Sequence, residues 1–250
     1  MIFAKPGDDA SQLAASIRTV IEHRSSNSSR SRQKAIGISE IGDPCARKLA
    51  YKILDWDKTN TSSDPWPSIQ GTAIHSWLAD AFEKFNIKGE ERFLIEFKVK
   101  VSEEISGTCD LFDITDKMII DHKCMGASSM KARKKDGMTI TQRVQVNLYA
   151  YGAEKMGHQV EKVALACYPL GGRLDDLHTI IEDYDRQLAV DAIERLDGIK
   201  LLVWQLDPEN NPSHWSLIPA SPAYGCIYCP FYLPNSTDLS VGCPGEKAVA

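Results

Sequence analysis

The chain has 250 residues, of which 43% are hydrophobic and 25% are charged, and its formal net charge is -5. A chain of this size and composition can bury one sizeable core without a partner. No apolar run is long enough to span a membrane and the N terminus lacks the pattern of a signal peptide, so we expect a cytoplasmic protein without membrane partners.

The N-terminal region predicts a helix and a linker. Apolar residues recur at helical spacing over Asp9–His23, which predicts an amphipathic helix that packs on the rest of the protein. Residues 24–34 are rich in Ser, Asn and Arg, which suits either a flexible linker or a basic patch. We therefore assign residues 1–35 to an N-terminal helix and linker, and residues 36–250 to the principal domain.

Two further helices are expected before the first strand. Asp43 followed by Pro44 favours an N-cap and first turn of a helix that carries Cys45 at its start. The next helix is expected over Trp66–Phe85, where His75 falls outside the apolar stripe.

The middle of the chain predicts an α/β core. Alternating apolar residues indicate a meander of three strands, followed by a long helix, two more strands and a last long helix. The predicted ranges are 92–101, 105–114 and 117–123 for the meander, 139–156 for the helix, 162–168 and 177–184 for the strands, and 185–205 for the last helix. The segment after Asp207 is rich in Pro, Asn and Ser, and we expect it to have little capacity to order itself.

Charged residues lie in two neighbouring strands of the meander. Asp110 stands in GTCDLFD, and Asp121, His122 and Lys123 stand together in MIIDHKC. Both runs alternate, so the two carboxylates and the ammonium can converge. Two acids can hold a divalent cation that lowers the pKa of water and offsets charge on a phosphate, while the lysine orients the nucleophile or screens charge. The pattern predicts metal-assisted hydrolysis; solvated charges at a strand end are the alternative.

The cysteines fall into two groups. Cys45 lies early in the chain and a trio lies late, and a cytosolic chain of this size has no need of disulfides, so metal ligation is the better explanation. Zinc and a [4Fe-4S] cluster are not separated by residue type. The late trio is Cys226, Cys229 and Cys243. Cys109, Cys124 and Cys167 lie in or beside strand-like runs, where we expect them to be small buried hydrophobic residues.

The order of these motifs resembles the RecB-like branch of the PD-(D/E)XK nuclease superfamily. The motifs are His75, Gly107-x-x-Asp110, Asp121-x-Lys123 and Gln145-x-x-x-Tyr149, and the match spans Ser39 to Tyr149. One early cysteine and a late trio resemble the iron-sulfur nucleases of that branch, which include the AddB nuclease domain and the CRISPR-associated iron-sulfur exonucleases.

The resemblance implies a restriction-endonuclease-like α/β fold, in which helices flank a mixed central sheet and a metal cluster joins the N- and C-terminal segments. It implies that Mg²⁺ or Mn²⁺ is bound by His75, Asp110, Asp121 and the carbonyl of His122. Lys123 would be the catalytic lysine, and Gln145 and Tyr149 would support the active site or contact DNA. The [4Fe-4S] cluster would be bound by Cys45, Cys226, Cys229 and Cys243.

The expected function is therefore a metal-dependent DNA exonuclease in recombination, repair or phage DNA processing. Its substrate would be single-stranded DNA or duplex ends, with recombination or helicase proteins as further partners. The basic run at residues 131–135 favours DNA contact over a solvated loop. The alternative is a non-catalytic iron-sulfur protein on the same fold that binds DNA or senses redox state, and a zinc-stabilised structural protein is a third reading. The joint presence of Asp110, Asp121 and Lys123 favours the enzyme.

Overall fold

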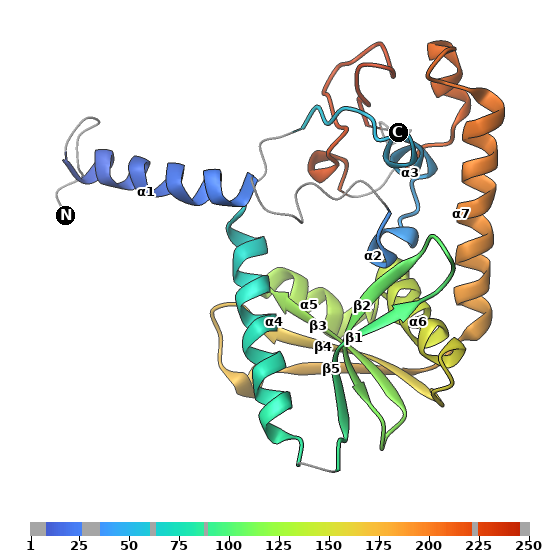
Figure 1. The fold of residues 1–250 in the computed structure, drawn as a ribbon. Helices are drawn as coiled ribbons and strands as arrows, with labels where there is room; N and C mark the ends of the chain where they lie inside the picture. The colour runs from blue at the N-terminus through green and yellow to red at the C-terminus, as the bar shows by residue number, and fades with distance from the viewer. Residues whose placement is uncertain (1–8, 27–35, 61–63, 88–89, 222–224, 246–250) are drawn as a thin grey trace.

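A five-stranded sheet forms the centre of the protein in a computed structural model that describes residues 9–26, 36–60, 64–87, 90–221 and 225–245 (Figure 1). The strand order is β1-β2-β3-β4-β5. Strands β3 and β4 run parallel, and the other neighbours are antiparallel, so the sheet is mixed, as predicted. The strands are β1 (Phe93–Lys100), β2 (Ser106–Asp113), β3 (Met118–Met125), β4 (Lys162–Pro169) and β5 (His178–Asp183).

Helices lie on both faces of this sheet. Neighbouring residues of a strand point to opposite faces; Asp121 of β3 contacts α6, whereas His122 stacks on Phe82 of α4. Helices α4 and α6 therefore cover opposite faces. The helices are α1 (Asp9–Ser26), α2 (Ile38–Ile41), α3 (Ala46–Ile53), α4 (Trp66–Phe85), α5 (Ala127–Asp136), α6 (Ile140–Lys155) and α7 (Arg186–Leu206), with short 3-10 turns at Leu174–Asp176, Pro212–Leu217 and Cys226–Tyr228.

The larger core lies between the sheet and α6 and α7. Buried side chains of one face of β4, such as Val163 and Leu165, pack with Val146 and Leu148 of α6 and with Leu196 of α7. The short helix α2 also packs on α6. This core fixes α6 against the strands that carry the predicted acids.

A second core orders the segment after Asp207. The ring of Trp215 stacks on Tyr51 of α3 at 4.1 Å between centroids, and Phe231 stacks on Tyr51 at 5.0 Å. All three side chains are buried. The prediction that this segment has little capacity to order itself was wrong, because a few large apolar residues among its polar ones pack against α3 and α7.

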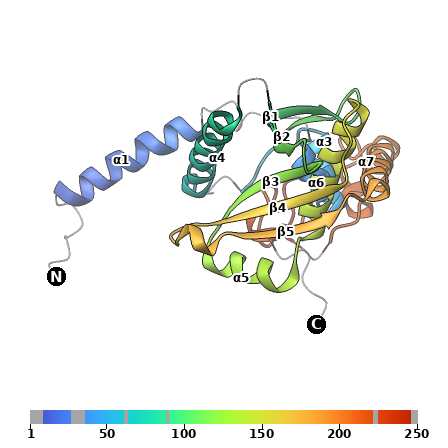
Figure 2. The same ribbon diagram turned by 90° about the horizontal axis from the view of Figure 1, so that it is seen from below.

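The N-terminal helix differs from its prediction. Helix α1 projects away from the sheet (Figures 1 and 2), and none of its residues is buried. The expectation that it packs on the rest of the protein was wrong, because its large apolar residues Leu13, Ile17 and Val20 are exposed. Residues 27–35, which include most of the predicted linker, lie outside the described residues. The division at residue 35 stays a prediction.

Two local predictions also need correction. Helix α3 begins one residue after Cys45, which is itself the N-cap: its Sγ accepts a hydrogen bond from Lys48 N, whereas Asp43 accepts one from Cys45 N. Helix α5 lies where the sequence pattern predicts no helix or strand; only one of its side chains, Met130, is buried, so it has no periodic apolar pattern. Within the described ranges, no helix is both long and apolar enough to cross a membrane.

Candidate active site and cysteine cavity

The two predicted acids lie where β2 and β3 separate. The antiparallel ladder between these strands stops after the pair Leu111 and Ile120. The next residues are Asp110 and Asp121. Because the ladder stops, the backbone N–H of His122 is available to a side chain, and it donates a 2.8 Å hydrogen bond to Asp110 Oδ2.

Asp110 is held in its charged form by His75. The Nδ1 atom of His75, on α4, lies 3.3 Å from Asp110 Oδ1. Burial disfavours ionisation of Asp110, but the hydrogen bond and charge of His75 outweigh it, so the pKa of Asp110 lies below its ordinary value. The same contact raises the pKa of His75, although burial opposes this. His75 and Asp110 therefore form a pair in which both charged states are favoured.

Asp121 has the opposite electrostatic environment. Its side chain is 2% exposed, and burial raises its pKa to about 6, although Lys123 acts in the other direction. Gln145 of α6 donates a 2.8 Å hydrogen bond to Asp121 Oδ1 and lies 3.4 Å from the hydroxyl of Tyr149, one turn further along the helix. Burial also raises the pKa of the Tyr149 phenol, which keeps it protonated.

The side chain of His122 lies on the α4 face of the sheet. Its ring stacks on Phe82 at 5.8 Å, contacts the ring of His75 edge-on at 6.0 Å, and has Nδ1 at 3.3 Å from the Tyr168 hydroxyl. Burial lowers the pKa of His122 to about 4, so the ring is neutral. Sequence reasoning considered only the carbonyl of His122 and missed Phe82 and Tyr168, which lie in helix and strand patterns without a distinguishing motif.

The acid site, which we define as His75, Asp110, Asp121, Lys123, Gln145 and Tyr149, fits a divalent cation by the chemistry of its donors. Asp121 Oδ2 is buried, and its close partner is the ammonium of Lys123, whose Nζ lies 2.7 Å away. An oxygen of this kind beside a second carboxylate suits a hard cation. In the described residues, however, no three His, Cys, Asp or Glu side chains already stand in a ligating arrangement.

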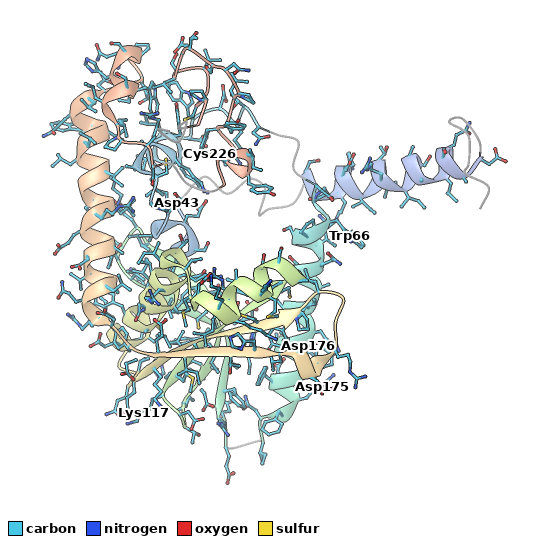
Figure 3. All side chains as sticks on the ribbon, turned by 180° about the vertical axis from the view of Figure 1, so that it is seen from behind. Asp43, Trp66, Lys117, Asp175, Asp176 and Cys226 are labelled. Carbon is cyan, nitrogen blue, oxygen red and sulfur yellow. The ribbon has the colours of Figure 1, made fainter. Side chains whose placement is uncertain are left out.

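The four clustered cysteines line one cavity of about 240 Å³, here named the cysteine cavity. Its wall brings the N-cap residue Cys45 together with Cys226, Cys229 and Cys243, and also includes Asp43 and Thr141 (Figure 3 labels Asp43 and Cys226). Thiol donors of this number fit a zinc ion or an iron-sulfur cluster. Their sulfur atoms are not gathered at ligating distances in the part of the chain that the structure describes.

The other three cysteines are separate from this cavity. Cys109 and Cys167 are fully buried in the larger core, as predicted. The prediction of burial was wrong for Cys124, which is partly exposed near the end of β3. Burial raises the pKa of all three thiols, as it also does for Cys229 in the cavity.

The fold is similar to that of a solved alkaline exonuclease from Laribacter hongkongensis. The TM-score is 0.50 at 13% sequence identity, over 75% of this chain and 97% of that one. A phage-related exonuclease from Haemophilus somnus 129PT gives a TM-score of 0.46 at 14% identity, over 70% and 96% of the two chains. The Laribacter enzyme in complex with dAMP gives 0.48 at 12%, over 76% and 97%. No protein-family model matches the chain, and no curated protein matches it either.

Proposed function

We propose that this protein is a metal-dependent DNA exonuclease of the PD-(D/E)XK type, in its RecB-like branch. The observation that carries the proposal is the meeting of Asp110, Asp121 and Lys123 where β2 and β3 separate. A protein that only binds DNA or senses redox state has no need of a buried carboxylate whose charged form is disfavoured by burial, which costs stability. The fold shared with an alkaline exonuclease supports the same reading.

The proposed cation is Mg²⁺ or Mn²⁺, held by His75, Asp110, Asp121 and the carbonyl of His122. A bound cation of this kind would polarise the phosphodiester and lower the pKa of the attacking water. The side chains of the acid site position the metal ligands and the phosphate. Gln145 fixes one oxygen of Asp121, His75 fixes one oxygen of Asp110, and the Lys123 ammonium offsets negative charge beside the substrate phosphate.

For the cysteine cavity we propose a [4Fe-4S] cluster bound by Cys45, Cys226, Cys229 and Cys243. The cavity lies between the start of α3 and the C-terminal segment, so a bound cluster would hold these two parts of the chain together. Protein purified without oxygen should be brown and contain about four irons per chain. A colourless protein with one zinc would replace this part of the proposal with a structural zinc site.

The substrate is proposed to be single-stranded DNA or duplex ends in recombination, repair or phage DNA processing, with recombination or helicase proteins as further partners. An end-dependent enzyme degrades linear DNA and spares a closed circle. We therefore expect anaerobically purified protein with Mg²⁺ or Mn²⁺ to shorten end-labelled linear DNA and leave covalently closed circular DNA of the same sequence intact. Rapid cutting of the circle would overturn exonuclease action but not nuclease action.

The control for this assay is a lysine outside the site. Lys123→Met should abolish cleavage of the linear substrate, whereas Lys100→Met, which removes an exposed lysine paired with Glu103, should not. Equal cleavage by both variants would contradict the role of Lys123.

A further inference from the structure

Helix α5 presents an exposed lysine face that its own fold does not need. The helix is attached through Met130, which is buried, and Arg133, which donates hydrogen bonds to Gly137 O and Gln142 Oε1. Lys131, Lys134 and Lys135 are three and four residues apart and therefore share another face, which is exposed. We name these three residues the lysine face.

The lysine face is electrostatically unfavourable as it stands. Like charges at these spacings destabilise a helix. Lys131 and Lys134 have no ion pair with any described residue, and Lys135 has only Asp136, at 4.0 Å and exposed. Some lysines elsewhere are paired more closely, such as Lys84 with Asp80 at 2.7 Å. A polyanion placed along the lysine face would offset this repulsion.

The position of α5 connects this face to the acid site. The helix begins at Ala127, four residues after Lys123, and contacts β3 and β4. Cys167 of β4 lies opposite Lys123 of β3 in the sheet. Burial raises the pKa of the Cys167 thiol, and the nearby charge of Arg133 on α5 partly lowers it. The side of α5 that carries Arg133 is therefore next to β3, the strand that carries Asp121 and Lys123. The lysine face lies on another side of a helix about 10–12 Å wide.

We propose that Lys131, Lys134 and Lys135 bind the phosphate backbone of the DNA strand that is being cut, on the side of the acid site where α5 lies. Ammonium groups on flexible stems contact phosphates without reading bases, so this binding is independent of sequence. The inference rests on the proposed nuclease function and adds the path of the DNA strand across the protein surface.

The test measures DNA binding without cleavage. In an Asp121→Asn background, the affinity for a fluorescein-labelled single-stranded oligonucleotide is measured between about 50 and 200 mM NaCl. Lys131→Gln with Lys134→Gln should reduce the slope of log affinity against log salt by about 1.4, which corresponds to two lost phosphate contacts. The loss should be equal for oligonucleotides of different sequence. The matched control, Lys98→Gln with Lys162→Gln, removes two exposed lysines from strands β1 and β4 and should leave the slope unchanged.

The outcomes separate this inference from the function on which it rests. If the protein cleaves DNA but the lysine-face variant keeps the salt slope and affinity of the parent, the inference is wrong and the nuclease stands. If the parent binds no oligonucleotide at 50 mM NaCl and the unsubstituted protein cleaves none, both fall. Binding to anionic lipid vesicles that needs Lys131 and Lys134, without an effect on DNA, would assign the surface to a membrane and overturn the proposal.

Discussion

The two acids of the acid site occupy neighbouring strands yet differ in charge preference, and local contacts explain why. Asp110 accepts a backbone hydrogen bond from His122 and lies beside His75, so its pKa is lowered although burial opposes this. Asp121 is more deeply buried, and its pKa is raised by burial to about 6, even with Lys123 nearby. At neutral pH without metal, the charged carboxylate of Asp121 therefore destabilises the folded protein.

This destabilisation should depend on pH. The pKa of Asp121 in the folded protein is about 6, above its ordinary value of 3.8. The stability that this group contributes is therefore fully present below pH 3.8 and is lost as the pH rises through about 6. Asp121→Asn has no such titration. In metal-free buffer, its unfolding free energy relative to the unsubstituted protein should rise between pH 4 and 7, by at most about 3 kcal/mol. Urea unfolding at each pH measures this difference, and a difference constant over that range would show that the pKa of Asp121 is ordinary.

At the scale of elements, helix α6 links the two sites. Its first residues, Ile140 and Thr141, line the cysteine cavity, and Gln145 one turn later contacts Asp121. Helix α2 packs on α6 from the side, with Gly42 so close that a Cβ there would lie 2.8 Å from Val144 Cβ. A displacement of α2 would therefore move the helix that orients Asp121.

Gly42→Ala tests this packing. The φ of Gly42 is -75°, which any residue can adopt, so the cost is steric and we expect a loss of about 1–3 kcal/mol in unfolding free energy together with slower DNA cleavage. Gly198→Ala in α7 is the control: no atom lies within 4 Å of its added Cβ, and it should stabilise the helix by about 0.5–1 kcal/mol. Similar stability for the two variants in thermal melts would argue against tight packing of α2 on α6.

The sequence predicted the elements with strong periodicity and missed those without it. Helix Trp66–Phe85 and the three strands of the meander were found because apolar residues recur in them at regular spacing. Helix α5 has a single buried residue and so no periodic signal. The residues of the acid site follow from motif order, but the point where β2 and β3 separate, which gives Asp110 its contact with His122, depends on strand register that the sequence does not display.

The whole molecule is built around two cores that share helix α7. The larger core supports the acid site, and the smaller one packs α3 and the C-terminal segment around Trp215 and Tyr51 (Figure 1). Because Trp215 is fully buried, the C-terminal segment is held by apolar packing in addition to any metal in the cysteine cavity. Loss of that metal alone should leave the segment around Trp215 packed.

Trp215→Ala should open the smaller core selectively. Truncation of a fully buried tryptophan costs about 3–5 kcal/mol, and we expect limited proteolysis to cut after Asp207 while fragments of the sheet persist. Leu217→Ala, two residues away and 59% exposed, should be nearly neutral. If both variants resist protease equally, the smaller core does not hold the segment.

The central claim is that Asp121 is kept buried and charged for catalysis, and one paired measurement on Asp121→Asn tests it most directly. Cleavage of end-labelled linear DNA with Mg²⁺ or Mn²⁺ should fall by orders of magnitude, because the amide removes an anionic oxygen that the proposed cation needs. The melting temperature of the same metal-free protein at pH 7 should rise, because burial disfavours the charged carboxylate more than Lys123 favours it, as its raised pKa shows. Full cleavage by this variant, or a loss of cleavage that accompanies unfolding, would contradict the account.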